Sequence, residues 1–195
     1  TYDEVSELVE QLGEKRFRGK QLYEWMHVHN VASYDEMTNL PKKFREKLAE
    51  TTTYTALKKV DCQISKEDGT RKYLFALADG NMAERVLMRY LFRLEDGNVI
   101  ESVWMQYHHG NSVCISSQVG CRMGCRFCAS TLDGLERNLT PSEILDQIYA
   151  IERDTQEKVS NLVVMGTGEP MDNYDNVVRF IHLLTDEHGK NLSQR

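Results

Sequence analysis

The sequence lacks any apolar run near the roughly 18 residues that a membrane-spanning helix needs, and its acidic, amphipathic start does not fit a signal peptide. It also lacks an excess of positive charge, and the net charge of −6 argues mildly against a nucleic-acid-binding surface over the whole molecule. A basic stretch at residues 15–20 is, on its own, best interpreted as a solvated helix end. The 195 residues, 41% of them hydrophobic, suffice for one full domain and a small second one.

The sequence also lacks an even number of cysteines: it has five, which argues against a disulfide framework. Four of the five cysteines fall within residues 114–128. This crowding is typical of a metal or redox site in a reducing compartment, so the sequence predicts a cytoplasmic protein. The fifth cysteine, Cys62, is interpreted as an inert buried thiol.

Hydrophobic periodicity predicts an α/β protein in three parts. Residues 1–57 have helical spacing, and residues 58–110 have the alternation and Asp-Gly pairs of a β-meander. Within the meander, residues 73–90 and 90–107 align without gaps and are identical at 11 of 18 positions, which indicates a duplicated hairpin. Residues 111–195 alternate between strand and helix patterns, which predicts a parallel sheet.

Cys121, Cys125 and Cys128 have the spacing C-x-x-x-C-x-x-C. Three thiolates can each bind one iron of a 4Fe–4S cluster and leave the fourth iron without a protein ligand, whereas an electron-transfer ferredoxin would supply a fourth cysteine. An open iron can be chelated by the amino and carboxylate groups of S-adenosylmethionine (SAM). The motif therefore predicts a cluster that cleaves SAM reductively.

The alternative is a zinc knuckle in which Cys114, His108 or His109 supplies a fourth ligand. Zinc loops favour paired C-x-x-C units, and the sequence has no second pair. Such a module would be non-catalytic and associated with RNA.

A Gly-rich turn follows the apolar run at residues 162–165, which we expect to be a buried strand. Gly168 would let the backbone approach a ligand closely, and Glu169 could accept a hydrogen bond from the amino group of SAM. The turn lies one predicted helix downstream of the cysteine motif, and this order strengthens both assignments.

Residues 116–128, 137–140 and 168–170 closely resemble the RlmN/Cfr family, radical-SAM methyltransferases of adenine in ribosomal RNA. Residues 12–21 and 36–41 resemble the helical accessory domain of the same family. The resemblance is closest to the RlmN branch, which methylates adenine C2 in 23S rRNA and in tRNA; the rival Cfr branch methylates C8. It implies a partial radical-SAM (βα) barrel, a 4Fe–4S cluster, SAM, an external one-electron donor and a monomer.

The resemblance also implies two catalytic residues. Family members methylate one of their own cysteines, convert that methyl group to a radical that adds to adenine, and resolve the adduct with a second cysteine. Cys114 lies where the resolving cysteine is expected, and Glu101 lies where a proton acceptor is expected. Without the resemblance, Cys114 would be interpreted as a buried thiol and Glu101 as an exposed strand residue. Glu84, in the first hairpin copy, is expected to lie away from the site.

The methylated cysteine of the family would lie beyond Arg195. The resemblance therefore implies that this chain is inactive alone. The sequence also departs from the family at one place, because the hairpin that carries Glu101 is single in the family and double here.

Overall fold

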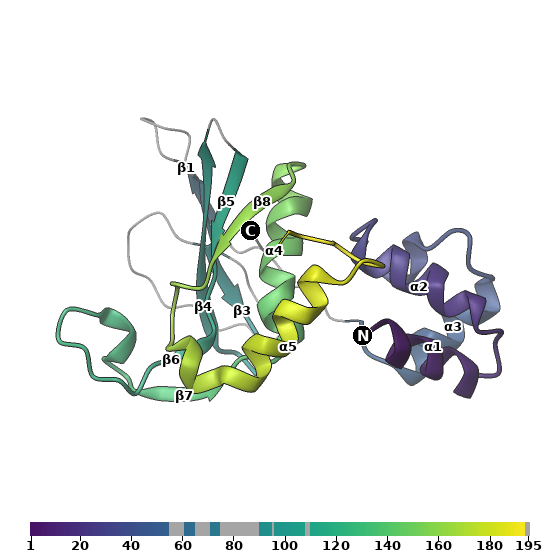
Figure 1. Cartoon of the computed structure of the whole chain (residues 1–195), viewed down its shortest axis with the longest axis horizontal. Helices are drawn as coiled ribbons and strands as arrows, with labels where there is room; N and C mark the ends of the chain where they lie inside the picture. Colours follow the sequence, from purple (N-terminus) through teal and green to yellow (C-terminus); the bar gives the residue numbers. More distant parts are fainter. Residues whose placement is uncertain (55–60, 65–70, 75–89, 95, 108–109, 194–195) are drawn as a thin grey trace. The chain divides into compact units, whose positions relative to one another are not determined.

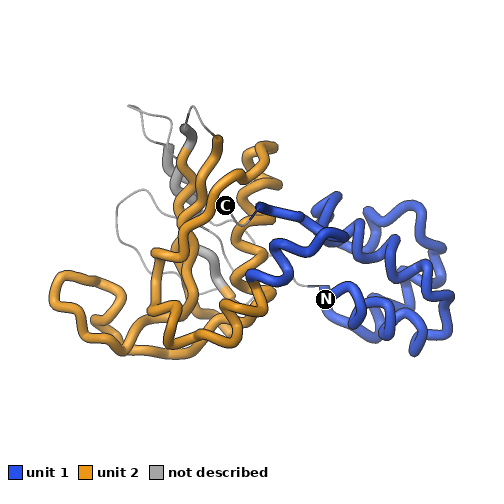
Figure 2. The backbone as a smooth tube through the Cα atoms, in the orientation of Figure 1, with its two compact units in different colours: residues 1–56, 181–195 blue, residues 57–180 orange. Residues whose placement is uncertain are grey.

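The computed structural model describes the chain except for residues 55–60, 65–70, 75–89, 95, 108–109 and 194–195. The chain divides into two compact units, one of residues 1–56 with 181–195 and one of residues 57–180 (Figure 2). None of the described helices is both long and apolar enough to cross a membrane.

The first unit is helical, as the spacing of its apolar residues predicts. Its elements are α1 (Tyr2–Gln11), α2 (Phe17–His27), the short 3-10 helix η1 (Tyr34–Glu36) and α3 (Lys42–Thr51). The core is formed by Val9, Leu22, Phe44 and Leu48, all nearly inaccessible to solvent. Because each helix contributes one apolar stripe to this core, the unit is held together mainly by burial of those stripes.

The second unit is built on a mixed sheet (Figure 1). Its strands are β1 (Asp61–Ile64), β2 (Arg71–Leu74), β3 (Tyr90–Arg93), β4 (Val99–Tyr107), β5 (Gly110–Cys114) and β8 (Val159–Val163), in the order β1-β2-β4-β5-β8 with β3 also paired to β4. The pairs are antiparallel except β5–β8, which is parallel. The predicted α/β class is confirmed.

Only the second copy of the repeat can be compared with its prediction. It forms the β3–β4 hairpin, in which Tyr90 pairs with Ser102 and Arg93 with Val99. Most of the first copy, including Glu84, lies outside the described residues.

Helix α4 (Pro141–Thr155) is the crossover that makes β5 and β8 parallel, and α5 (Tyr174–Thr185) follows β8. The α4 helix starts where the sequence predicts: the Thr140 hydroxyl accepts from the Glu143 N–H, the Glu143 carboxylate accepts from the Thr140 N–H, and Pro141 occupies the first turn. The buried residues Ile144, Ile148 and Ile151 then form its inward face.

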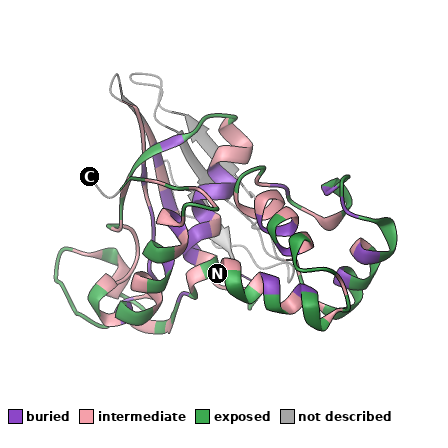
Figure 3. Cartoon of the chain, turned by 45° about the vertical axis from the view of Figure 1, so that its right-hand side comes forward, coloured by how far each residue is buried: buried purple, intermediate pink, exposed green. Residues whose placement is uncertain are grey.

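This helix covers one face of the sheet, where Ile100, Trp104 and Val113 are buried (Figure 3). The expectation of a buried strand at residues 162–165 is wrong. The β8 strand ends at Val163, and Val163 and Met165 are 40% and 78% exposed. Successive side chains of a strand point to opposite faces, so these two lie on the face opposite α4.

A buried polar side chain joins α4 to the sheet. Gln147 is fully buried, and its Oε1 accepts from the Ser116 N–H at 2.9 Å and from Ser102 Oγ at 2.6 Å. Its Nε2 donates to the Ser116 carbonyl oxygen at 3.0 Å. Gln147 thus satisfies polar groups at the end of β5 that would otherwise be buried without partners.

We expect Gln147→Met, which conserves side-chain length, to lower the free energy of unfolding by about 3 kcal/mol, because it leaves buried donors and acceptors unsatisfied. Urea denaturation followed by circular dichroism would measure the change. The matched control is Gln11→Met, at an exposed helix position, where we expect less than about 0.5 kcal/mol. Equal effects at both positions would contradict a special role for the buried amide.

Candidate active site

Three consecutive buried residues, Ser116, Ser117 and Gln118, follow β5 and form the centre of the candidate site. The Ser116 hydroxyl donates to the Glu101 carbonyl oxygen at 2.5 Å and accepts from the Thr167 N–H at 2.8 Å. The N–H groups of Ser117 and Gln118 both donate to the Thr167 carbonyl oxygen. This tripeptide therefore connects β4, which carries Glu101, to the Gly-rich turn.

The Gly-rich turn requires glycine at position 168. Gly168 has φ +105°, and a Cβ there would lie 2.6 Å from the Gln118 Cβ, so a larger residue would be both strained and blocked. The next N–H, that of Glu169, donates to Gln118 Oε1 at 2.8 Å. The Glu169 carboxylate begins the 3-10 helix η3 (Pro170–Asn173), because its Oε1 accepts from the Met171 N–H at 3.0 Å.

The three motif cysteines lie on one loop. Its base is a small antiparallel sheet of β6 (Gln118–Gly120) and β7 (Leu135–Asn138), closed by a 2.9 Å bond from the Cys121 N–H to the Gly134 carbonyl oxygen. Gly120 has φ +72°, and a Cβ there would lie 2.0 Å from that same carbonyl oxygen. The loop can therefore close only with glycine at position 120.

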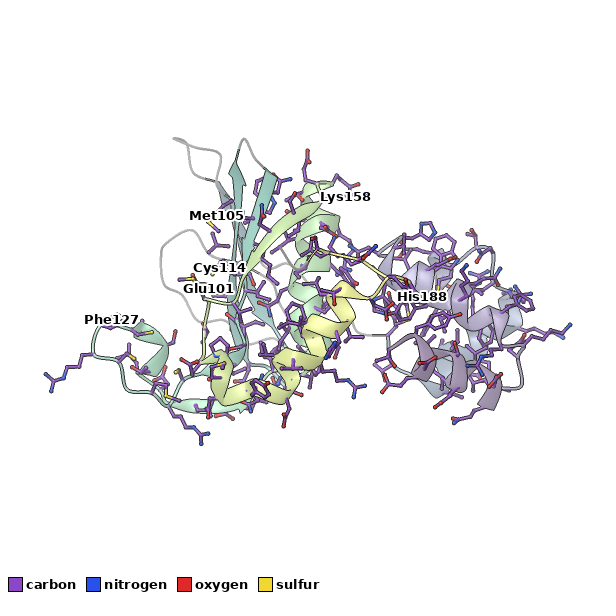
Figure 4. All side chains as sticks on the ribbon, viewed as in Figure 1. Glu101, Met105, Cys114, Phe127, Lys158 and His188 are labelled. Atoms are coloured by element: carbon purple, nitrogen blue, oxygen red, sulfur yellow. The ribbon has the colours of Figure 1, made fainter. Side chains whose placement is uncertain are left out.

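Cys121 is buried at the base of the loop, Cys125 is exposed and Cys128 is half-buried. Phe127 is 95% exposed at the outer end of the loop (Figure 4). Within the described part of the chain, no three His, Cys, Asp or Glu side chains lie together as a metal-binding group, so the three sulfur atoms share a loop without being gathered.

The donor chemistry fits an iron–sulfur cluster. Three free thiols lie within eight residues of a largely exposed loop, and Gly124 has φ +69° between the first two. Of the fourth ligands considered for zinc, Cys114 lies at the end of β5, outside the cysteine loop. His108 and His109 lie outside the described residues.

Glu101 and Cys114 lie together on the face of the sheet opposite α4 (Figure 4). Cys114 pairs with Val103, two residues from Glu101 on β4, and cross-strand partners point to the same face. The pKa of the Cys114 thiol is raised, first by burial and also by the Glu101 charge, while a hydrogen bond from the Met165 backbone lowers it. The structure therefore brings the predicted acceptor and the predicted thiol together.

The sequence analysis did not identify the buried polar residues that hold these parts in place. Gln118 Nε2 donates to Asn138 Oδ1 at 2.8 Å and to Asp172 Oδ2 at 3.0 Å. Asn173 Nδ2 donates to the carbonyl oxygens of Ser117 and Leu139, at 2.8 and 2.9 Å. The one available signal was that 116–118 is a polar run directly after an apolar strand, a position where buried polar groups need partners.

Two family models match this chain. One is described as the ribosomal RNA large subunit methyltransferase N-terminal domain and matches residues 1–53. The other is the radical SAM superfamily and matches residues 115–193, which include the cysteine loop and the Gly-rich turn.

Curated relatives match over the whole chain. It is 59% identical to a probable dual-specificity RNA methyltransferase RlmN of Lachnospira eligens, covering 100% of this chain and 51% of that protein. A protein of the same description from Lachnoclostridium phytofermentans is 54% identical, with 100% and 50% covered. The chain thus spans about half the length of these relatives.

A solved structure agrees. The crystal structure of a radical SAM methyltransferase from Sphaerobacter thermophilus superposes with a TM-score of 0.84 at 36% identity, covering 100% of this chain and 53% of that one. Taken together with the cysteine loop and the Gly-rich turn, these matches show that the chain belongs to the RlmN family of radical-SAM proteins.

Proposed function

We propose that this chain is part of a radical-SAM methyltransferase that methylates C2 of an adenine in 23S rRNA and in tRNA. The observation that carries the proposal is the tripeptide 116–118, which is hydrogen-bonded to the strand of Glu101 and to the Gly-rich turn and leads directly into the cysteine loop. A single buried segment thus joins the strand of Glu101, the Gly-rich turn and the base of the cysteine loop. The relatives are described as probable dual-specificity RNA methyltransferases, which supports RNA as the substrate.

The proposal includes three parts of the chain: a helical accessory domain at 1–57, a β-meander at 58–110 and the first part of the radical-SAM barrel at 111–195. The protein acts as a monomer in the cytoplasm and takes one electron at a time from an external donor. Net charge −6 leaves the RNA contacts to local surfaces rather than to the whole molecule.

In this proposal Cys121, Cys125 and Cys128 hold a 4Fe–4S cluster, which when bound supplies the electron for reductive cleavage of SAM. Glu169 accepts a hydrogen bond from the amino group of SAM. Its Oε1 is already held by the Met171 N–H, which fixes the carboxylate, and its Oε2 has no hydrogen-bond partner among the described residues. The carboxylate is therefore preorganised to accept a cationic donor.

Glu101 accepts the proton that leaves the adenine ring, and the Cys114 thiol resolves the protein–RNA adduct. Both side chains lie on the sheet face that α4 does not cover, beside the exposed Val163. The raised pKa of Cys114 keeps it a thiol at neutral pH, so proton loss must precede or accompany its attack.

We expect Cys125→Ala to abolish the iron–sulfur absorption of the chain after anaerobic reconstitution with iron and sulfide, because the loop then offers two thiolates. Metal analysis would report the iron bound, and zinc in its place would favour the non-catalytic alternative. Cys62→Ala, outside the loop, is the control and should retain the chromophore. Equal loss from both variants would show that the ligand loop is misassigned.

We expect Glu169→Gln to weaken SAM binding roughly tenfold or more while leaving the iron content unchanged, because a charge-assisted hydrogen bond contributes about 1.5–3 kcal/mol. Glutamine keeps the oxygen that accepts from Met171, so the turn is preserved. Equilibrium binding of SAM to the reconstituted protein measures the effect. Glu136→Gln, at an exposed position of β7, is the matched control; the same affinity in both variants would remove Glu169 from the site.

We expect Cys114→Ala, in the full-length protein, to form the protein–RNA adduct and fail to release it, so that nuclease-sensitive crosslinked protein accumulates when SAM is present. In the unmodified protein, release should become faster as pH rises, because the pKa of Cys114 lies above its ordinary value and the thiolate fraction is small at neutral pH. Gel electrophoresis of the crosslink would measure both effects.

The control for this experiment is Cys125→Ala, which should prevent the adduct from forming at all. Normal methylation by Cys114→Ala would mean that the thiol is structural.

A further inference from the structure

The cysteine loop has one lateral tether. Its ends are closed at Cys121 and Gly134, and residues 128, 131, 132 and 134 bond only within the loop. Within the described part of the chain, Arg122 alone among residues 122–133 forms a hydrogen bond or ion pair outside the loop, and its partner is Asp172 Oδ1. The outer loop is otherwise solvated, with Phe127 95% and Leu132 81% exposed.

Asp172 belongs to the other half of the site, three residues after Glu169 in η3. Its side chain is 12% exposed, against 63% for Arg122, so the carboxylate is the fixed partner and the guanidinium is the loop's contribution. Its second oxygen accepts from Gln118 Nε2 at 3.0 Å, and Gln118 Oε1 in turn accepts from the Glu169 N–H at 2.8 Å. One carboxylate thus connects the loop, the buried tripeptide and the Gly-rich turn.

We propose that Asp172 is a positioning residue that sets where the cysteine loop lies relative to Glu169. The inference rests on the proposed function, in which the cluster on the loop binds SAM and Glu169 accepts a hydrogen bond from its amino group. A ligand that must meet both elements binds well only if their separation is fixed before it arrives. Without the Arg122–Asp172 ion pair, the loop is held only at its base, by the bond between Cys121 and Gly134.

The test is Asp172→Asn, which keeps an oxygen acceptor for Gln118 and presents an amide donor to Arg122. In the reconstituted protein we expect unchanged iron and sulfide, and a SAM dissociation constant raised about tenfold, as for other groups that orient ligands. The electron paramagnetic resonance spectrum of the reduced cluster should shift only at a correspondingly higher SAM concentration. In the protein without iron, trypsin should cleave after Arg126 faster than in the unmodified protein.

A second variant, Arg122→Gln, changes an exposed residue and should weaken SAM binding by a similar factor. The double variant should bind no more weakly than Asp172→Asn, because both changes remove the same contact. The matched control is Arg16→Gln, which removes the same charge from a side chain that is equally exposed, at 63%, and that pairs with Glu10 in the first unit; its SAM affinity should be unchanged.

Unchanged SAM affinity in both Asp172→Asn and Arg122→Gln would overturn the inference, as would losses that add in the double variant. Loss of iron from Asp172→Asn would also overturn it, since the residue would then retain the cluster rather than position it. If the unmodified protein binds neither iron–sulfur cluster nor SAM, the proposed function fails and the inference with it. Normal binding by the unmodified protein with unaffected variants removes the inference alone.

Discussion

The second unit depends on hydrogen bonds that satisfy a buried polar segment where a strand ends. At residues 116–118 the chain leaves β5 and enters β6 without leaving the interior, so Ser116 and Ser117 need backbone partners in place of both a strand and water. Gln147 from α4, Asn173 from η3 and the backbone of Thr167 satisfy them. Each of these partners comes from a different part of the chain, so satisfying the segment also fixes α4, η3 and the Gly-rich turn against it.

This arrangement explains why the glycines of the site are needed. Gly166 and Gly168 both approach the segment so closely that a Cβ would lie 2.6 Å from its atoms. A turn with larger residues would lie farther from the segment, and the Thr167 carbonyl oxygen could not accept from the N–H groups of both Ser117 and Gln118. The two glycines let the turn approach the segment closely, and this approach is what gives the buried N–H groups of the segment their acceptor.

Local signals were enough to predict much of this. The Thr140-Pro141 start of α4, the helices of the first 51 residues and the α/β class followed from capping residues and apolar spacing, and the structure confirms them. The exposed Val163 and Met165 were missed because an apolar run does not reveal that one face of its strand lacks a covering helix. Gln118, Gln147 and Asp172 were missed because their partners lie 20 to 54 residues away in sequence. The roles of Glu101 and Cys114 came from resemblance; what the structure adds is that the two side chains share a face of the sheet.

β8 ends the strand order β1-β2-β4-β5-β8, so it has a sheet neighbour on one side only among the described strands. Its other edge offers a row of backbone donors and acceptors, and Val163 adds exposed apolar surface. Such an edge accepts a further strand without any change to the existing register. A right-handed crossover through α5 would deliver that strand parallel to β8, repeating the step by which α4 placed β8 beside β5. Each strand added in this way would cover the edge left by the one before it and widen the face that carries Cys114.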